Sequence, residues 1–195
     1  MARVFLLRHG ETEWSANGRH TGRTDIPLTE RGRKLAEAAA PTLAALRPGA
    51  GPPARVVTSP RARARVTAEL AGLEPDAVDP RLAEWDYGDY EGLTTPQIRE
   101  TVPAWTVWTH PCPGGESAEQ VGERADAVLA DARAVLPDGD VVLVGHGHFS
   151  RVLIARWLGM PAAGGVHVAM DAAAWAVLGD ERGVPRLDAV NLRIP

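Results

Sequence analysis

Short apolar runs alternate with amphipathic segments along the chain, and this alternation predicts alternating strands and helices. Segments 3–7, 55–58 and 140–145 read as short strands, the last of them central. Apolar positions at helical spacing predict helices over residues 29–47, 62–71, 116–136 and 149–158, the first with a kink at Pro41. Segments 172–178 and 186–190 read as two strands around a turn at Gly183. This order predicts a three-layer α/β/α sandwich with a mainly parallel central sheet.

Two regions depart from this pattern. A polar stretch from His9 to Pro27 follows the first strand and shows neither helical nor strand periodicity. Residues 76–82 read as extended, and residues 85–116, rich in Trp, Pro and Gly, read as an excursion with a short helix near residues 97–101. No repeat or linker divides the chain, so we expect residues 1–195 to form one domain whose excursion covers the active site.

Composition excludes several classes of protein. The 195 residues are 45% hydrophobic, and no apolar run approaches the ~20 residues that span a bilayer. The apolar stretch near the N-terminus is too short for a secretory signal, which predicts a cytoplasmic protein. The single cysteine, Cys112, excludes an intrachain disulfide and a multi-cysteine zinc site. A net charge of −4 without a basic run argues against nucleic acid as a partner, whereas a homodimer stays open.

Candidate functional residues follow three of the predicted strands: Arg8-His9-Gly10, Ser59-Pro60-Arg61 and His146-Gly147-His148. Because the ends of parallel strands meet at one edge of a sheet, we expect Arg8, His9, Arg61 and His146 to converge on one pocket. Burying two arginines and two histidines is costly unless an anion lies among them, and a phosphoryl group fits the guanidinium fork.

Such a cluster is suited to phosphoryl transfer. The positive field keeps a histidine neutral, so one ring nitrogen is free to attack, and the arginines offset the charge on the phosphoryl oxygens. The leaving alkoxide needs an acid, and Glu84, between apolar neighbours, is our candidate. Glu91 and Glu116 are its rivals.

These motifs, together with Glu11-Thr12-Glu13-Trp14 and the segment from Glu84 through Tyr87 to Gly92, resemble the histidine phosphatase superfamily, also called phosphoglycerate-mutase-like. The match spans nearly the whole chain in the family's order. The resemblance implies that His9 is transiently phosphorylated, that Arg8, Arg61 and His146 hold the phosphate, and that Glu84 donates the proton and then activates water. It further implies contacts to substrate from other residues: Thr12, Ser15, Thr21, Gly22, Tyr87, Gly147 and His148.

The family contains phosphatases and mutases. A mutase must hold a second phosphate and exclude water, yet residues 93–116 offer only Arg99 as a permanent cation. We therefore expect hydrolysis of small phosphorylated metabolites, sugar phosphates among them, because the motifs around Glu84 and His146 are similar to the acid phosphatase and sugar-bisphosphatase branches. A cofactor-dependent phosphoglycerate mutase and a non-catalytic module that binds a phosphorylated ligand are the alternatives.

Several of the same residues have other interpretations, as a metal site, a dinucleotide site or structural residues. His146 and His148 lack the carboxylate neighbours of a metal site, and Gly145-x-Gly147 is only a partial dinucleotide fingerprint, so we expect neither a metal nor a cofactor. We interpret Arg63 and Arg65 as a solvated helix face. The six tryptophans are interpreted as packing residues of the excursion.

Overall fold

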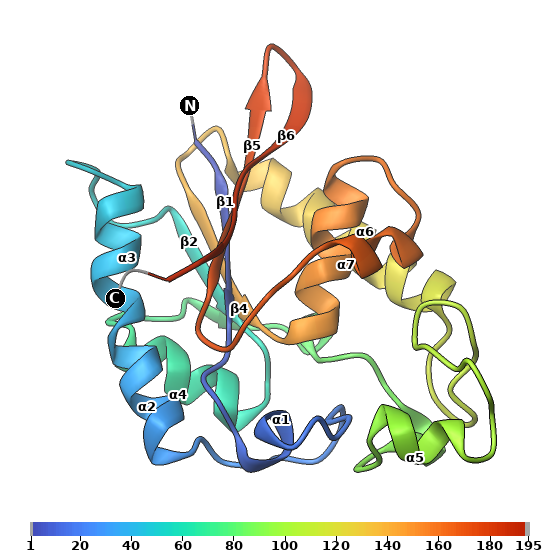
Figure 1. Ribbon diagram of the computed structural model, residues 1–195. Coiled ribbons are helices and arrows are strands. Elements are labelled where there is room, and N and C mark those ends of the chain that lie inside the picture. The colour runs from blue at the N-terminus through green and yellow to red at the C-terminus, as the bar shows by residue number, and fades with distance from the viewer. Residues whose placement is uncertain (1, 194–195) are drawn as a thin grey trace.

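A six-stranded sheet forms the centre of the computed structural model, which describes residues 2–193 (Figure 1). Strands β3, β2, β4 and β1 run parallel, while β5 runs antiparallel to β1 and β6 runs antiparallel to β5. The spatial order is β3-β2-β4-β1-β5-β6. The strands are β1 (Val4–Arg8), β2 (Arg55–Thr58), β3 (Ala77–Val78), β4 (Val141–Gly145), β5 (Trp175–Glu181) and β6 (Val184–Leu192).

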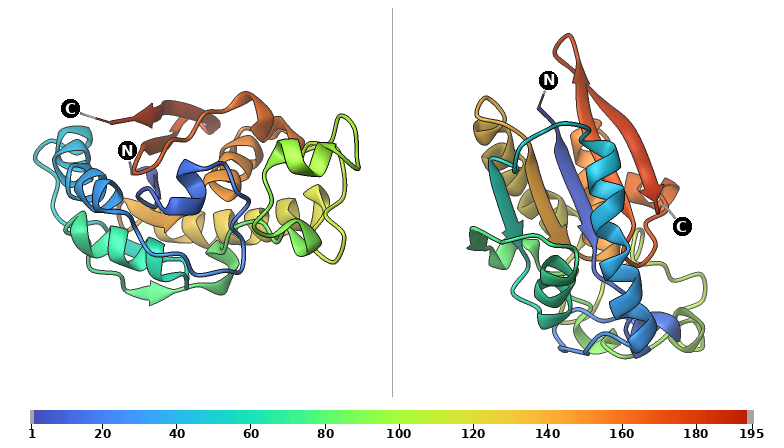
Figure 2. Two further views of the ribbon diagram at one scale, coloured as in Figure 1. Left: turned by 60° about the horizontal axis from the view of Figure 1, so that its bottom comes forward. Right: turned by 90° about the vertical axis from the view of Figure 1, so that its left-hand side faces the viewer.

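Helices cover both faces of this sheet (Figures 1 and 2). The helices α2 (Glu30–Glu37), α3 (Ala39–Leu46) and α4 (Ala62–Leu70) lie on one face, and α6 (Ala118–Val135) and α7 (Gly147–Trp157) on the other. The short helices α1 (Glu13–Ala16) and α5 (Thr95–Arg99) lie beyond the lower end of the sheet in Figure 1. The predicted three-layer α/β/α fold class is thereby confirmed.

Side chains of β1 alternate between two hydrophobic cores. Val4 and Leu6 pack into the core beneath α6 and α7, whereas Phe5 and Leu7 pack into the core beneath α3 and α4. Successive side chains of a strand point to opposite faces, so an uninterrupted apolar run fills both layers. All four side chains are fully buried, which accounts for the absence of any polar residue between Val4 and Leu7.

The carboxyl ends of three parallel strands coincide at one edge of the sheet. Arg8 pairs with Gly145, and Thr58 pairs with Val144. The backbone N–H of His9 then donates to the Gly145 carbonyl at 2.9 Å, and that of Ser59 donates to the Val144 carbonyl at 2.9 Å. This register delivers the residues after β1, β2 and β4 to the same place, where a ligand is expected in a sheet of this kind.

The observed elements differ from the predicted ones in several places; the short helix expected near residues 97–101, for example, is α5 at Thr95–Arg99. The helix expected over residues 29–47 is two helices that meet at Ala38, because Pro41 has no N–H for the Glu37 carbonyl and its ring crowds that turn. The extended segment 76–82 contains only β3, followed by a 3₁₀ turn over Pro80–Leu82. The four residues of α1 were not predicted, since a reciprocal pair of hydrogen bonds between Thr12 and Ser15, rather than an apolar face, sets its start.

Within residues 2–193, no helix is long and apolar enough to cross a lipid bilayer.

Candidate active site

A cavity of about 290 Å³ opens where β1 ends. Arg8 and His9 line it, and α7 contributes residues from its first turn. Glu84 lines it from the segment after the Pro80–Leu82 turn. The lining residues are Arg8, His9, Ser15, Gly18, Arg19, His20, Thr21, Glu84, Tyr87, Thr95, Gly147, His148, Arg151 and Met170.

The His9 imidazole is fixed in one tautomer. Its Nδ1 lies 2.7 Å from the Gly10 carbonyl oxygen, and a carbonyl can only accept, so Nδ1 carries the proton. The lone pair of Nε2 is therefore free. Burial, and then the positive charges of Arg63 and Arg8, lower the pKa of His9 well below its usual range. His9 is a neutral imidazole with an unshared lone pair, as a nucleophile requires.

His146 lies next to His9 with its ring centroid 5.2 Å from that of His9. It is fully buried, and its Nε2 lies 2.7 Å from the Ser59 hydroxyl oxygen. Burial, and then the charges of Arg63 and its other basic neighbours, lower the pKa of His146 well below the usual range. Because the Ser59 hydroxyl oxygen accepts from the Arg61 backbone N–H at 3.3 Å, we assign the hydroxyl hydrogen to His146 Nε2. The proton of the neutral ring then lies on Nδ1, which has no partner within residues 2–193.

The structure contradicts the sequence interpretation of Arg63. Only 1% of this residue is exposed, so the prediction of a solvated face is wrong for it and right only for the exposed Arg65. Nη1 donates to the Thr24 carbonyl at 2.8 Å and Nη2 to the Thr21 carbonyl at 2.9 Å. The charge of Arg63 lowers the pKa of both His9 and His146, so this buried guanidinium acts on both imidazoles.

Four buried donors near these imidazoles lack a partner. Among residues 2–193, these are the only buried side-chain nitrogen or oxygen atoms without a hydrogen bond: Arg8 Nε, Arg61 Nε, Arg63 Nε and His146 Nδ1. Buried polar groups are nearly always satisfied, and an unsatisfied one costs about 1–3 kcal/mol. The three arginines all act on the pKa of His146, so their unsatisfied donors and His146 Nδ1 are suited to hold an anion, and we call these four groups the anion cradle.

Arg61 takes a more peripheral position than Arg63. It is half-buried and lines an adjacent cavity of about 380 Å³ that also reaches Glu84. Its charge contributes to the lowered pKa of His146, after burial and the charges of Arg63 and His9. The structure thus brings Arg8, His9, Arg61 and His146 together, and adds Arg63 to them.

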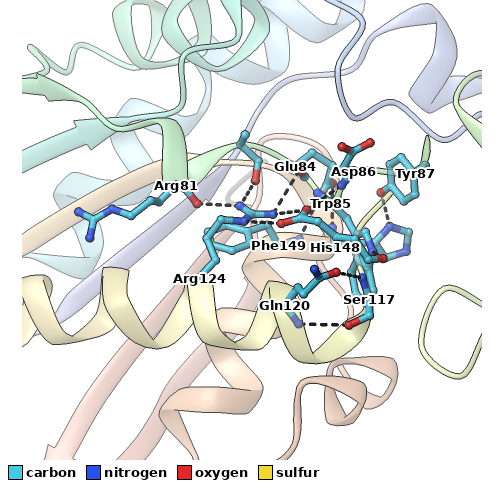
Figure 3. A network of polar contacts seen from close by, with 12 residues as sticks. Arg81, Glu84, Trp85, Asp86, Tyr87, Ser117, Gln120, Arg124, His148 and Phe149 are labelled. Atoms are coloured by element: carbon cyan, nitrogen blue, oxygen red, sulfur yellow. Dashed lines mark hydrogen bonds and ion pairs between the residues drawn. The ribbon is translucent and has the colours of Figure 1, made fainter. Parts of the chain in front are cut away.

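The Glu84 carboxylate caps the N-terminus of α7 (Figure 3). Oε2 accepts from the backbone N–H of His148 at 2.9 Å, and Oε1 accepts from that of Phe149 at 2.8 Å. No side chain at His146, the N-cap residue, provides such a bond. The unpaired N–H groups of a helix start favour a carboxylate, so the position of α7 after β4 also fixes Glu84 beside His146.

Arg124 of α6 positions the Glu84 segment. Its Nη1 donates to the carbonyls of Arg81 and Ala83, both at 2.7 Å, and its guanidinium lies 4.3 Å from the centroid of the Phe149 ring (Figure 3). Glu116, one rival to Glu84, is paired with Arg124 at 2.7 Å.

Glu91, the other rival, accepts from the backbone N–H groups of Gly22 and Thr24. Both alternatives to Glu84 are therefore bound to other groups of the protein, and neither lines the cavity that contains His9.

The predicted substrate contacts divide into two groups. Ser15, Thr21, Tyr87, Gly147 and His148 line the cavity, whereas Thr12 and Gly22 do not.

Thr12 is fully buried and caps α1. Gly22 is enclosed, because a Cβ there would lie 2.5 Å from the Trp85 carbonyl oxygen. The structure gives these two residues a role in shaping the loop.

Two lining residues are held by close contacts. The Tyr87 hydroxyl and His148 Nδ1 share a hydrogen bond of 2.6 Å, which orients the His148 ring (Figure 3). A Cβ at Gly147 would lie 3.1 Å from Arg8 Cζ, so the lack of a side chain there lets the guanidinium pack against the start of α7.

The arrangement combines a neutral imidazole, an anion cradle and one carboxylate. Together they can attack a phosphoryl group, stabilise its oxygens and move a proton. Within residues 2–193, no group of three or more His, Cys, Asp or Glu side chains is placed to hold a metal ion.

Comparison with known proteins shows the family. The model of the histidine phosphatase superfamily (branch 1) matches residues 4–193. An acid phosphatase of Mycobacterium tuberculosis is 52% identical over 190 residues, which cover 97% of this chain and 92% of that protein. Sedoheptulose 1,7-bisphosphatase of Saccharomyces cerevisiae is 34% identical, covering 81% of this chain and 68% of that protein.

Solved structures agree with this result. The structure of a Mycobacterium tuberculosis open reading frame superposes with a TM-score of 0.94 at 50% identity, covering 98% of each chain. A mycobacterial glucosyl-3-phosphoglycerate phosphatase solved with VO3 superposes with a TM-score of 0.83 at 36% identity, covering 98% of this chain and 99% of that one. The chain belongs to the histidine phosphatase superfamily, as its motifs indicate, and it is a phosphatase.

Proposed function

We propose that this phosphatase hydrolyses phosphate monoesters of small metabolites, with His9 as the temporary carrier of the phosphoryl group. Relatives named acid phosphatase, sedoheptulose 1,7-bisphosphatase and glucosyl-3-phosphoglycerate phosphatase support this class of substrate. We also propose a cytoplasmic location, consistent with the single cysteine, Cys112, and we keep the homodimer as a prediction.

In the first half of the reaction, His9 Nε2 attacks the phosphorus atom and the ester P–O bond breaks. Glu84 gives its proton to the leaving oxygen, so an alcohol departs and a phosphohistidine remains. Arg8, Arg63 and His146 Nδ1 donate hydrogen bonds to the phosphoryl oxygens, with Arg61 contributing at the edge. These donors are already in place before the reaction, which is the condition under which they lower a barrier most effectively.

In the second half, the Glu84 carboxylate takes a proton from water, and the water oxygen attacks phosphorus. The N–P bond breaks, which releases inorganic phosphate and returns His9 to its neutral form. Glu84 regains the proton that it gave to the leaving group, so the cycle needs no further acid.

The cradle of four unpartnered buried donors is the single observation that carries the proposal. A structural histidine cluster would satisfy its own hydrogen bonds, whereas this one leaves three guanidinium nitrogens and one imidazole nitrogen available to an anion.

Hydrolysis is favoured over a mutase because Arg99, the cation between residues 93 and 116, donates through Nε to the Trp105 carbonyl at 2.9 Å. It does not line the His9 cavity.

Release of phosphate from 4-nitrophenyl phosphate tests the proposal, with His9→Ala compared with His167→Ala. His167 is an exposed histidine outside the cavity, so its replacement should leave turnover unchanged. His9→Ala should abolish turnover while the fold persists. Undiminished activity of His9→Ala contradicts the proposal, and so does formation of 2-phosphoglycerate from primed 3-phosphoglycerate faster than release of phosphate, which defines a mutase.

A further inference from the structure

One backbone carbonyl holds the side chain of Arg8. Within residues 2–193, the guanidinium makes a single hydrogen bond, in which Nη1 donates to the Met170 carbonyl oxygen at 2.6 Å. Met170 is the first residue of a turn, residues 170–174, that precedes β5, and it lines the cavity beside Arg8. The position of this carbonyl therefore decides where the guanidinium lies.

The 170–174 turn also holds the backbone at the end of β1. The Ala173 N–H donates to the His9 carbonyl at 3.1 Å, and the Ala174 carbonyl accepts from the Arg8 N–H at 3.2 Å. One turn thus fixes the side chain of Arg8 and the backbone of both Arg8 and His9. Since the barrier of a phosphoryl transfer depends on the placement of such groups, the shape of this turn matters for the reaction.

The turn contains a residue in an unfavourable backbone conformation. Ala173 has a φ of +54°, in the left-handed region that residues with a Cβ rarely adopt, and it is only 2% exposed. Such a conformation persists only where the surrounding structure imposes it. Contacts outside the turn therefore have to hold it in this shape.

Asp171 makes these contacts with the carboxyl end of β6. Its backbone N–H donates to Asn191 Oδ1 at 2.7 Å, and its Oδ2 accepts from Asn191 Nδ2 at 3.3 Å. Arg193, just after β6, donates through Nη2 to the same Oδ2 at 2.9 Å. Asn191 and Arg193 tie the turn down in this way, although neither is among the described residues that line the cavity.

Asp180 provides a comparison within the same β5–β6 hairpin. Its Oδ1 accepts from the Gly183 N–H at 2.8 Å, so it closes the connection between the two strands at the other end of the hairpin (Figure 1). Asp171 makes the same kind of bond at the end where Arg8 lies. Its charge also acts on Arg8: burial lowers the pKa of Arg8, and the negative charges that raise it include those of Glu84 and Asp171.

We propose that Asp171 is a positioning residue for the reaction and that it acts on Arg8 through the Met170 carbonyl. Asn191 holds Asp171 in turn, so β6 contributes to phosphoryl transfer without touching the substrate. The inference rests on the proposed function, because that function places Arg8 among the donors to the phosphoryl oxygens. When Asp171 is removed, Ala173 leaves the left-handed region, the Met170 carbonyl moves and Arg8 loses the partner of its side chain.

The test measures the affinity for orthovanadate by calorimetry and kcat/KM for 4-nitrophenyl phosphate. Orthovanadate takes the five-coordinate geometry of the transition state, so its affinity reports on Arg8 without any turnover. Asn191→Gly removes the side chain and keeps the backbone, because glycine fits the φ of +54° at this position. Misplacement by about 1 Å costs up to about 10²-fold, so Asn191→Gly and Asp171→Ala should each lose about tenfold to a hundredfold in both measurements, with kcat falling more than KM rises.

A double-mutant cycle with Arg8→Met separates positioning from a general loss of stability, which urea unfolding measures alongside. In the Arg8→Met background, Asp171→Ala should change the affinity for orthovanadate by less than about twofold, because the group that it positions is gone. Asp180→Ala, the control on the same hairpin, should keep the wild-type values. Asp171→Asn retains an acceptor for Asn191 and Arg193, so it should recover most of the loss.

Two results overturn the inference while leaving the phosphatase intact. Wild-type affinity and kcat/KM in both Asp171→Ala and Asn191→Gly would show that the turn needs no tether. A loss in Asp171→Ala that persists undiminished in the Arg8→Met background would show that Asp171 does not act through Arg8. A wild type that neither binds orthovanadate nor releases phosphate would contradict the proposed function itself.

Discussion

Replacement of Arg63 tests the anion cradle most sharply, because the sequence supplies neighbours of the same type on the same helix. We consider the variants Arg63→Met, Arg61→Met and Arg65→Met. Methionine keeps the length of the aliphatic stem and removes the guanidinium. The three positions differ in burial: Arg63 is 1% exposed, Arg61 is half-buried and Arg65 is exposed.

The geometry sets the expected order of effects. Arg63 uses Nη1 and Nη2 on the carbonyls of Thr24 and Thr21, which fixes the guanidinium and leaves its buried Nε without a partner. Loss of one preorganised donor to a developing charge costs about 10²–10³ in kcat, which is the loss expected for Arg63→Met. Arg61→Met should lose about tenfold, since Arg61 lies at the edge, and Arg65→Met should stay within about twofold.

The pH profile provides an independent readout of the same variant. The charge of Arg63 is one cause of the lowered pKa of His9, after burial. Without that charge, the pKa of His9 rises toward its usual range, and His9 takes up a proton at a higher pH. Since only the neutral ring attacks, the acid limb of kcat/KM should move to higher pH in Arg63→Met and stay in place in Arg65→Met.

Steady-state hydrolysis of 4-nitrophenyl phosphate from pH 4 to 8 measures both effects, with urea unfolding alongside. Arg63→Met leaves the carbonyls of Thr21 and Thr24 without their donor, so we add Arg63→Lys, which keeps the charge but cannot reproduce the fork. Wild-type kcat/KM in folded Arg63→Met would refute the reasoning, as would a larger loss in Arg61→Met than in Arg63→Met.

Three further predictions concern Gly147, Glu84 and His20. Gly147→Ala should lower kcat/KM about tenfold, because the added Cβ would lie 3.1 Å from Arg8 Cζ and displace the guanidinium; unchanged kinetics would show that Arg8 adjusts at no cost. Glu84→Gln should lower kcat/KM, which reports the first half of the reaction, by about 10²–10⁴ for alkyl phosphates and much less for 4-nitrophenyl phosphate, because nitrophenolate leaves without a proton; equal losses in kcat/KM would remove Glu84 as the acid. Burial lowers the pKa of His20 from 6.5 to about 4, so wild-type stability should fall with acidification across this interval. The free energy of unfolding of His20→Gln, measured in urea, should rise relative to that of the wild type by up to about 3 kcal/mol as the pH falls across this interval. A difference between the two proteins that does not change with pH would refute this prediction.

The functional residues at the strand ends could be predicted from sequence because each follows directly on an apolar run. Arg8 and His9 interrupt an apolar run that fills two cores, and His146 does the same after β4. Parallel pairing then brings them to one edge without further information. The same logic predicted the fold class, since buried strands and amphipathic helices alternate.

Arg63 was missed because its helix does not show its buried face through large apolar residues. We interpreted Val66 and Leu70 as the apolar face, yet both are half-buried, and the buried positions of α4 are Arg63, Ala64, Thr67 and Ala68. Small alanines let a helix approach a sheet closely while contributing little hydrophobic signal. Thr67, four residues after Arg63 and bonded to the Gly10 N–H at 2.9 Å, was the available clue, because polar residues spaced by four lie on one face.

Arg151 and Arg19, which also line the cavity, were not predicted for a different reason. Residues 93–116 offer only Arg99, whereas Arg151 comes from α7 and Arg19 from the loop after α1. Only the tertiary fold brings these segments together.

Trapping of the phosphorylated enzyme tests the central claim most directly. A single turnover with ³²P-labelled substrate, quenched in alkaline detergent, should leave label on the protein that survives alkali, is lost in acid and maps to the peptide containing His9. His9→Ala should carry none under the same conditions. Label on a different residue, or hydrolysis by His9→Ala at the wild-type rate, would contradict the account.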